Sequence, residues 1–168
     1  EIADYEREIS HAVIDASARA VLGHHAHIMK GVEFYRGHPI LHGLGNFATV
    51  TDALAARDDD APERRSWARE RRRLFGFTPD PAMPRYPFHP ESRNTVIAML
   101  ETSPDGMRTA LRPCWIDDDA RPEPLTRAGG GEQVGEYVRR ITAEAGFDTG
   151  FVWEGDRLIA RDGRTTEE

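Results

Sequence analysis

Hydrophobic residues recur every three or four positions at both ends of the chain, which is the spacing of an amphipathic α-helix. The first such stretch predicts a helix over residues 3–18, whose apolar face consists of Ile2, Tyr5, Ile9, Val13 and Ala16. The second predicts a helix over 132–145, whose apolar face consists of Val134, Val138, Ile141 and Ala145. A third helix is predicted over 63–75, because Pro62 is well suited to a first helical position.

Short apolar runs bounded by turn residues predict β-strands between these helices. The run at 20–22 ends at Gly23 and is too short to alternate, which is typical of a buried strand in an α/β layer. Three pairs of strands joined by turns are expected, at 32–36 with 39–42, 95–100 with 107–116, and 151–153 with 157–160. Residues 117–124 are expected to form a loop.

The composition changes between residues 51 and 91. Prolines at 79, 81, 84, 87 and 90 exclude regular secondary structure across 78–91. We therefore expect an insertion or lid at about 51–91, between two elements of the core.

Composition and charge exclude several classes of protein. The 168 residues carry 22 Lys+Arg against 29 Asp+Glu and a formal net charge of −7, which argues against nucleic acid as a partner. No apolar run approaches the roughly 18 residues needed for a membrane span in this segment. Cys114 is the single cysteine, so there is no intrachain disulfide and no CxxC motif. The compartment stays open.

Three histidines follow the predicted strand at 20–22 and form the closest grouping of potentially catalytic or metal-binding side chains in the sequence. Neutral imidazole is a common ligand of Zn, Mn and Fe. In extended backbone, residues two apart point to the same side, so His25 and His27 can face one metal centre while His24 points away. The alternative is that these are solvated histidines of a surface loop, since an HxH pattern alone is a weak signal.

Three further residues are candidates for the same site. Asn46 follows two glycines, and its amide can orient a ligand histidine or a substrate oxygen, or it can cap a turn. Arg85 and His89 lie in a proline-framed loop at 83–90. If this loop covers the metal site, Arg85 would attract an anionic substrate and His89 would serve as acid or base. The alternative is a packed connector without a ligand.

The residues from Gly23 to Phe47 resemble those of the CapA-type poly-γ-glutamate biosynthesis proteins, relatives of the calcineurin-like metallophosphoesterases. The family pattern is G-x-H-P-H, G-x-E, P-I and S-L-G-N-F, and this chain has G-H-H-A-H, G-V-E, P-I and G-L-G-N-F. Ala26 stands where the family has Pro, and His42-Gly43 replaces Tyr-Ser. The resemblance implies the C-terminal part of an αββα sandwich of the calcineurin-like metallophosphoesterase fold.

The resemblance also implies a metal site with two divalent ions, of Mn, Fe, Zn or Co. His25 and His27 match the family's ligands, whereas His24 occupies a variable position and is expected to face the substrate. The family's earlier motifs, D-x-H, G-D and G-N-H-[ED], do not occur here, and the chain begins without Met. We therefore expect this chain to be the C-terminal half of a longer protein, whose N-terminal half carries the remaining ligands.

Three functions remain open from the sequence. The first is metal-dependent hydrolysis of a phosphoester or amide, with a peptide, polyglutamate or phosphoester as substrate. The second is epimerisation of a peptide at Cα. The third, from a different class, is a non-catalytic capsule component that binds poly-γ-glutamate.

Overall fold

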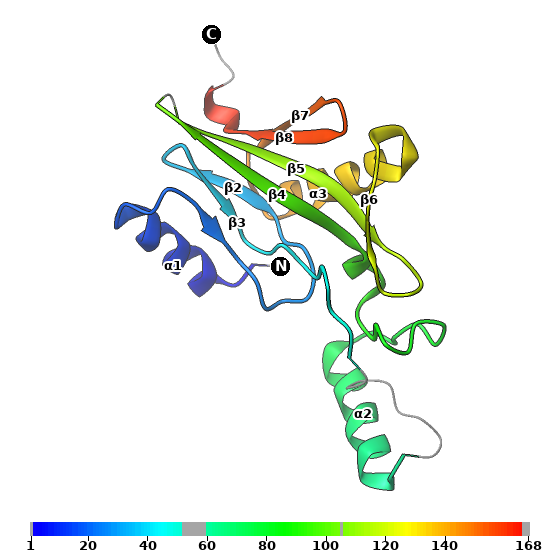
Figure 1. Ribbon diagram of the computed structural model, residues 1–168. Coiled ribbons are helices and arrows are strands. Elements are labelled where there is room, and N and C mark those ends of the chain that lie inside the picture. Colours follow the sequence, from blue (N-terminus) through cyan, green and yellow to red (C-terminus); the bar gives the residue numbers. More distant parts are fainter. Residues whose placement is uncertain (1, 52–59, 105, 166–168) are drawn as a thin grey trace.

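The protein is seen here in a computed structural model that describes residues 2–51, 60–104 and 106–165. Within these ranges it contains two β-sheets and three α-helices, which confirms the predicted α/β class (Figure 1). The arrangement is consistent with the C-terminal part of an α/β sandwich. No helix in the described ranges is long and apolar enough to span a membrane.

The smaller sheet carries the segment that leads into the histidines. It has the order β1-β3-β2 and contains β1 (Val21–Leu22), β2 (Val32–Tyr35) and β3 (His38–Leu41). The predicted hairpin of β2 and β3 is confirmed, and β1 lies parallel to β3. The prediction of a buried strand at 20–22 is wrong, because β1 lies at the sheet edge and Leu22 remains 49% exposed.

The larger sheet is antiparallel and confirms the two other predicted strand pairs. Its order is β4-β5-β8-β7, formed by β4 (Asn94–Ser103), β5 (Gly106–Ile116), β8 (Arg157–Arg161) and β7 (Gly150–Glu154). The predicted loop at 117–124 contains a further short strand, β6 (Pro122–Pro124), which pairs with β5. Both prolines can occupy this strand because it pairs on one side only, at the edge of the sheet.

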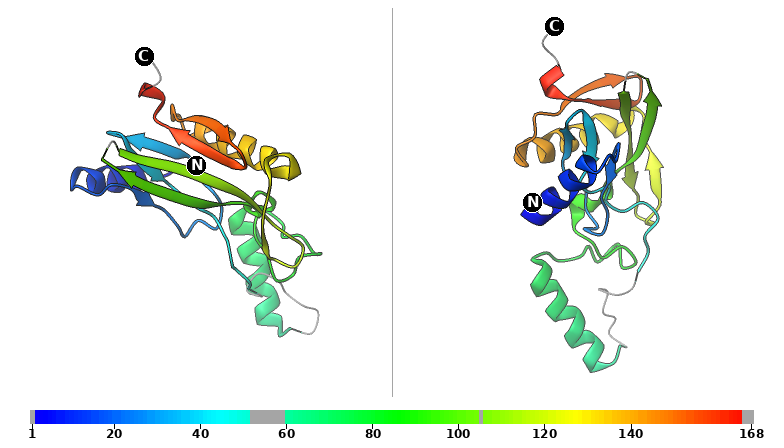
Figure 2. Two further views of the ribbon diagram at one scale, coloured as in Figure 1. Left: turned by 45° about the horizontal axis from the view of Figure 1, so that its top comes forward. Right: turned by 90° about the vertical axis from the view of Figure 1, so that its left-hand side faces the viewer.

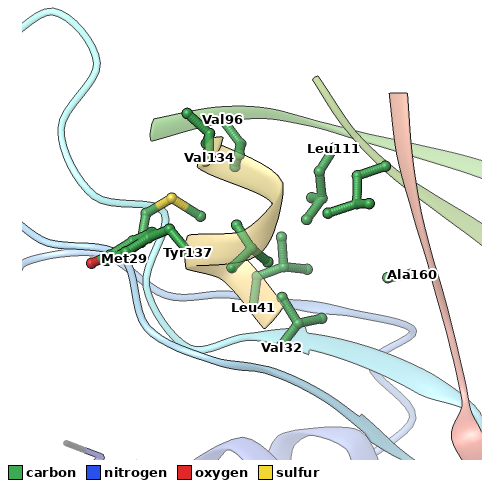
Figure 3. Packing of buried hydrophobic residues seen from close by; sticks show 10 residues of the cluster. Met29, Val32, Leu41, Val96, Leu111, Val134, Tyr137 and Ala160 are labelled. Atoms are coloured by element: carbon green, nitrogen blue, oxygen red, sulfur yellow. The ribbon is translucent and has the colours of Figure 1, made fainter. Parts of the chain in front are cut away.

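The hydrophobic core lies where the two sheets meet helix α3 (Glu132–Glu144) (Figure 3). Val134 and Val138 of α3 are fully buried, as its apolar spacing predicted. They pack against residues of both sheets and of the segment before β2, among them Met29, Val32, Leu41, Val96, Leu111 and Leu158. Helix α3 therefore holds the two sheets together.

Helix α1 (Asp4–Asp15) forms where the spacing predicted it, but it packs through a different face. Tyr5, Ile9 and Val13 are 63%, 60% and 42% exposed, whereas Ser10 and Ile14 are buried. The predicted apolar face is therefore not the face that contacts the sheet in this structure. The helix is held by polar contacts instead, including two hydrogen bonds from the Lys30 ammonium group to the Glu6 carboxylate.

The predicted insertion has one part that extends away from the two sheets and one part that packs against the end of β5 (Figure 1). Helix α2 (Pro62–Phe75) extends away from both sheets (Figure 1, Figure 2). The following segment returns to the core, where Met83, Tyr86 and Phe88 pack with Ile116 and Ala120. A short 3-10 helix, η1 (Pro90–Arg93), then leads into β4. Part of the expected insertion, residues 52–59, lies outside the described residues.

Candidate functional site

The histidine loop, residues 23–27, begins at Gly23 where the chain leaves the edge of the smaller sheet. The Gly23 N–H donates to the carbonyl of Leu41 at 2.7 Å, and the Gly23 carbonyl accepts from the N–H of Leu44 at 3.0 Å. A Cβ at this position would overlap the backbone of His42, so only glycine fits. The loop thus leaves the sheet from a fixed point.

Within the loop, two histidines have a backbone conformation that side-chain-bearing residues seldom adopt. His25 has φ 84° and His27 has φ 55°, both in the left-handed region. The expectation of extended backbone is therefore wrong, and strand alternation does not relate these two side chains. Such conformations cost about 1–3 kcal/mol and persist where surrounding contacts hold them. His24, His25 and His27 are all exposed.

His27 is the histidine of this loop that neighbouring side chains hold in place. Its Nδ1 lies 2.7 Å from Oδ1 of Asn46, and its ring stacks on Phe88 with centroids 4.8 Å apart. Asn46 is buried and donates from Nδ2 to the Tyr86 hydroxyl at 3.0 Å and to the His27 carbonyl at 3.3 Å. The main-chain carbonyl of Asn46 in turn accepts a hydrogen bond from Thr95 Oγ1. His27 and Asn46, both predicted for the site, therefore lie together.

Tyr86 continues this network away from His27. Its hydroxyl donates to the carbonyl of Ser92 at 2.8 Å. Burial raises the pKa of the Tyr86 hydroxyl above its ordinary value, although hydrogen bonds with Ser92 and Asn46 lower it in part. Tyr86 therefore stays neutral, with one proton to donate and lone pairs that accept from Asn46.

Arg85 and His89, the predicted site residues of the proline-framed loop, make contacts within the insertion. Arg85 is exposed, and its carbonyl accepts from the N–H of Thr51 at 2.9 Å, which joins the two ends of the insertion. His89 accepts from the N–H of Glu91 through Nδ1 at 3.1 Å and thereby caps the 3-10 helix η1. This capping role belongs to the packed-connector interpretation of the loop, and it leaves the other ring nitrogen of His89 uncommitted.

Tyr86 and Phe88 are contacts of the site that the sequence did not single out. Both belong to the proline-framed loop at 83–90, whose composition drew attention to Arg85 and His89 instead. The only signal was the presence of two aromatic residues between prolines, and this signal does not say which side chain they will meet.

The histidine loop provides imidazole nitrogen but not a complete metal site. In the ranges that the structure describes, no group of three or more His, Cys, Asp or Glu side chains is placed to hold a metal ion. A metal ion at this loop would therefore need ligands from outside the described residues.

A second histidine cluster lies on the other side of β3, around the glutamate of the G-V-E motif. Glu33 is buried between His42 and His11, and its two carboxylate oxygens each lie 2.8 Å from an Nε2. Burial raises the pKa of the Glu33 carboxyl, but its hydrogen bonds with His42 and His11 outweigh this, so the pKa lies below the ordinary 4.5. This cluster joins helix α1 to the smaller sheet.

Comparison with known proteins finds a similarity to one family in the first third of the chain. The family model for the bacterial capsule synthesis protein PGA_cap matches residues 1–51. The uncharacterized proteins y4sH and y4uA of Sinorhizobium fredii are each 45% identical to this chain over 47 residues, which are 28% of this chain and 10% of each relative. The PGA biosynthesis protein CapA of Bacillus subtilis is 41% identical over 55 residues, which are 33% of this chain and 14% of CapA.

These matches are short, and they span only 10–14% of the length of the relatives. The family-model match over residues 1–51 nevertheless includes Gly23, the three histidines of the loop and Asn46. The part of the chain that carries the histidine loop is therefore similar to the PGA_cap family of bacterial capsule synthesis proteins.

Proposed function

We propose that this chain is part of a metal-dependent CapA-like enzyme in which His25 and His27 bind divalent metal. The observation that carries the proposal is the contact between His27 Nδ1 and Asn46 Oδ1, beside an exposed ring. Histidines that bind metals nearly always use their second nitrogen in such a hydrogen bond, which fixes the ring and the tautomer. The metal would be Mn, Fe, Zn or Co, which imidazole nitrogen accommodates.

The remaining ligands are proposed to come from an N-terminal half of the same protein. Two imidazoles supply no negative charge, and a pair of divalent ions needs carboxylates to hold it together. The D-x-H and G-N-H-[ED] motifs expected from the family resemblance would provide them.

Each nearby residue has a role in this proposal. Bound metal would polarise an oxygen of the substrate and activate water for its hydrolysis. Asn46 holds His27, His24 contacts the substrate from the same exposed loop, and the exposed Arg85 attracts an anionic group. His89 exchanges a proton through the ring nitrogen that does not cap η1. The substrate class that suits this set is an anionic phosphoester or amide, including the glutamate polymer in the name of the Bacillus relative.

Metal binding tests this proposal directly. In the intact protein, His25→Ala or His27→Ala should lower Mn²⁺ affinity by more than about 100-fold, because loss of an outer partner alone costs about 10–100-fold. Isothermal titration with Mn²⁺ measures the change. His38→Ala is the matched control, since His38 begins β3 and contacts the carbonyl of Arg19 instead.

Two results would contradict the proposal. One is unchanged Mn²⁺ affinity in both variants, and the other is full activity of metal-free protein. Salt-sensitive binding to poly-γ-glutamate that survives both substitutions, without any turnover, would favour a non-catalytic capsule component instead.

The reaction itself can be separated from the alternative of epimerisation in heavy water. Hydrolysis breaks the phosphoester or amide bond and leaves the stereocentre without deuterium. Epimerisation leaves the peptide intact and incorporates deuterium at Cα. Mass spectrometry of the product from a peptide substrate distinguishes the two.

A further inference from the structure

The insertion contacts His27 through the Phe88 ring and contacts Asn46 through the Tyr86 hydroxyl. Tyr86 lies 40 residues beyond Asn46 in the sequence, yet its hydroxyl accepts from Asn46 Nδ2 at 3.0 Å. Both side chains are only 3% exposed, so water does not readily replace this contact. A residue of the insertion is thus connected to a residue that touches His27.

These contacts determine which way the Asn46 amide faces. The amide nitrogen has two acceptors, the Tyr86 hydroxyl and the His27 carbonyl. If the amide were turned over, its oxygen would face the His27 carbonyl, and two acceptors would meet without a proton between them. The Asn46 oxygen therefore faces His27.

The direction of the Tyr86 hydroxyl is also determined. Its single proton goes to the Ser92 carbonyl at 2.8 Å, so its lone pairs face Asn46. The Ser92 hydroxyl lies 3.2 Å from the Tyr86 hydroxyl but is closer to the carbonyl of His89, to which it donates at 2.6 Å. Each hydrogen bond that links Ser92, Tyr86 and Asn46 therefore has one donor and one acceptor that fit all the others.

The tautomer of His27 follows from this order. The Asn46 oxygen can only accept, so the neutral His27 ring carries its proton on Nδ1 and leaves the lone pair of Nε2 free. We propose that Tyr86 is a positioning residue that, through Asn46, holds His27 in the Nδ1–H tautomer with Nε2 ready to bind metal. The role of this tautomer in metal binding rests on the proposed function. The assignment of the tautomer does not depend on the proposed function.

Imidazole ¹⁵N chemical shifts test this assignment without metal. Two-bond ¹H–¹⁵N spectra at pH about 8, above the ordinary imidazole pKa of about 6.5, should show His27 protonated on Nδ1 and unprotonated on Nε2. In Tyr86→Phe the amide loses one of its two acceptors and can turn, so the His27 shifts should move toward the Nε2–H tautomer. Tyr137→Phe is the matched control, because Tyr137 is a buried tyrosine of the central core, and it should leave the shifts unchanged.

The tautomer itself separates positioning from general disruption. A purely structural role of Tyr86 would lower the stability of Tyr86→Phe but would leave the proton of His27 on Nδ1. Chemical denaturation of Tyr86→Phe at the same pH measures that loss of stability beside the ¹⁵N shifts.

The outcomes are distinct for the tautomer and for the metal. An Nε2–H tautomer in the unaltered protein, or unchanged shifts in Tyr86→Phe, would overturn the inference. Addition of Zn²⁺ should perturb Nε2 of His27, and Tyr86→Phe should weaken this binding by about 10-fold. If the tautomer behaves as expected but Zn²⁺ perturbs no histidine of the loop, the positioning stands and the proposed metal site is wrong.

Discussion

At the scale of single residues, Asn46 and Phe88 hold the His27 ring in place. His27 and Asn46 were expected to act together, and they lie in contact. The extended backbone expected at His25 and His27 was wrong, because local residue types do not reveal a left-handed conformation that tertiary contacts impose. Tyr86 could not be predicted as their neighbour, since no local pattern tells where a distant loop returns.

Glu33 provides a prediction about acid stability. Its carboxyl pKa is lowered in the folded state, so its contribution to stability is fully present above the unfolded value of about 4.5. The contribution is lost as pH falls through the lower folded pKa. Glu33→Gln should therefore destabilise the protein at pH 7, and it should reduce the extra loss of stability of the unaltered protein below about pH 4.5.

Urea unfolding between pH 7 and pH 3 measures this difference. Three side chains contact Glu33: His42, directly after β3, and His11 and Arg7 of helix α1. A pH dependence of Glu33→Gln identical to that of the unaltered protein would contradict the assignment. Asp119→Asn, at an exposed carboxylate in the turn before β6, serves as the control.

At the scale of elements, helices and hairpins were predicted well because their signals are local. Turn residues and apolar spacing lie within a few positions of each other, and they fix helix α3 and the β2–β3 hairpin without long-range information. The packing face of α1 was not predictable in this way. Its apolar stripe and its polar stripe are both regular, and the polar one contacts Glu33 and Lys30.

The two faces of helix α1 should differ in stability. Ile14 is 5% exposed and Ile9 is 60% exposed. Ile14→Ala should lower the free energy of unfolding by about 2–4 kcal/mol through the loss of buried side chain and the cavity left behind. Ile9→Ala makes the same change on the exposed face of the helix and should cost less than about 0.5 kcal/mol. Equal losses for both variants in chemical denaturation would show that the helix packs through its apolar stripe.

At the scale of the whole molecule, two sheets far apart in sequence are joined mainly through helix α3 and the segment after it. The Val32 N–H of β2 donates to Thr142 Oγ1 at 3.2 Å, and the Val32 carbonyl accepts from Thr149 Oγ1 at 2.7 Å. These contacts span more than 100 residues of chain. The residue pattern predicted three strand pairs, and only the family resemblance implied that they form two sheets packed in a sandwich.

Thr142→Val tests this connection with little change of shape. Thr142 is 1% exposed, so the substitution leaves the buried N–H of Val32 without its acceptor. An unsatisfied buried donor costs about 1–3 kcal/mol, and the free energy of unfolding should fall by that amount. Thr102→Val, at an exposed position near the end of β4, is the control and should change it by less than about 0.5 kcal/mol. A neutral Thr142→Val would indicate that Val32 finds another partner.

The left-handed backbone at His25 and His27 has a consequence for anyone who redesigns this chain. A search that ranks substitutions by backbone strain alone would choose glycine at both positions, since glycine adopts φ values of 84° and 55° without a steric cost. Each replacement would relieve on the order of 1 kcal/mol of strain, but at His27 it would also remove the hydrogen bond with Asn46 and the stack on Phe88. The least strained version of the loop would therefore have lost both imidazoles, and these two positions should be kept fixed when the protein is redesigned.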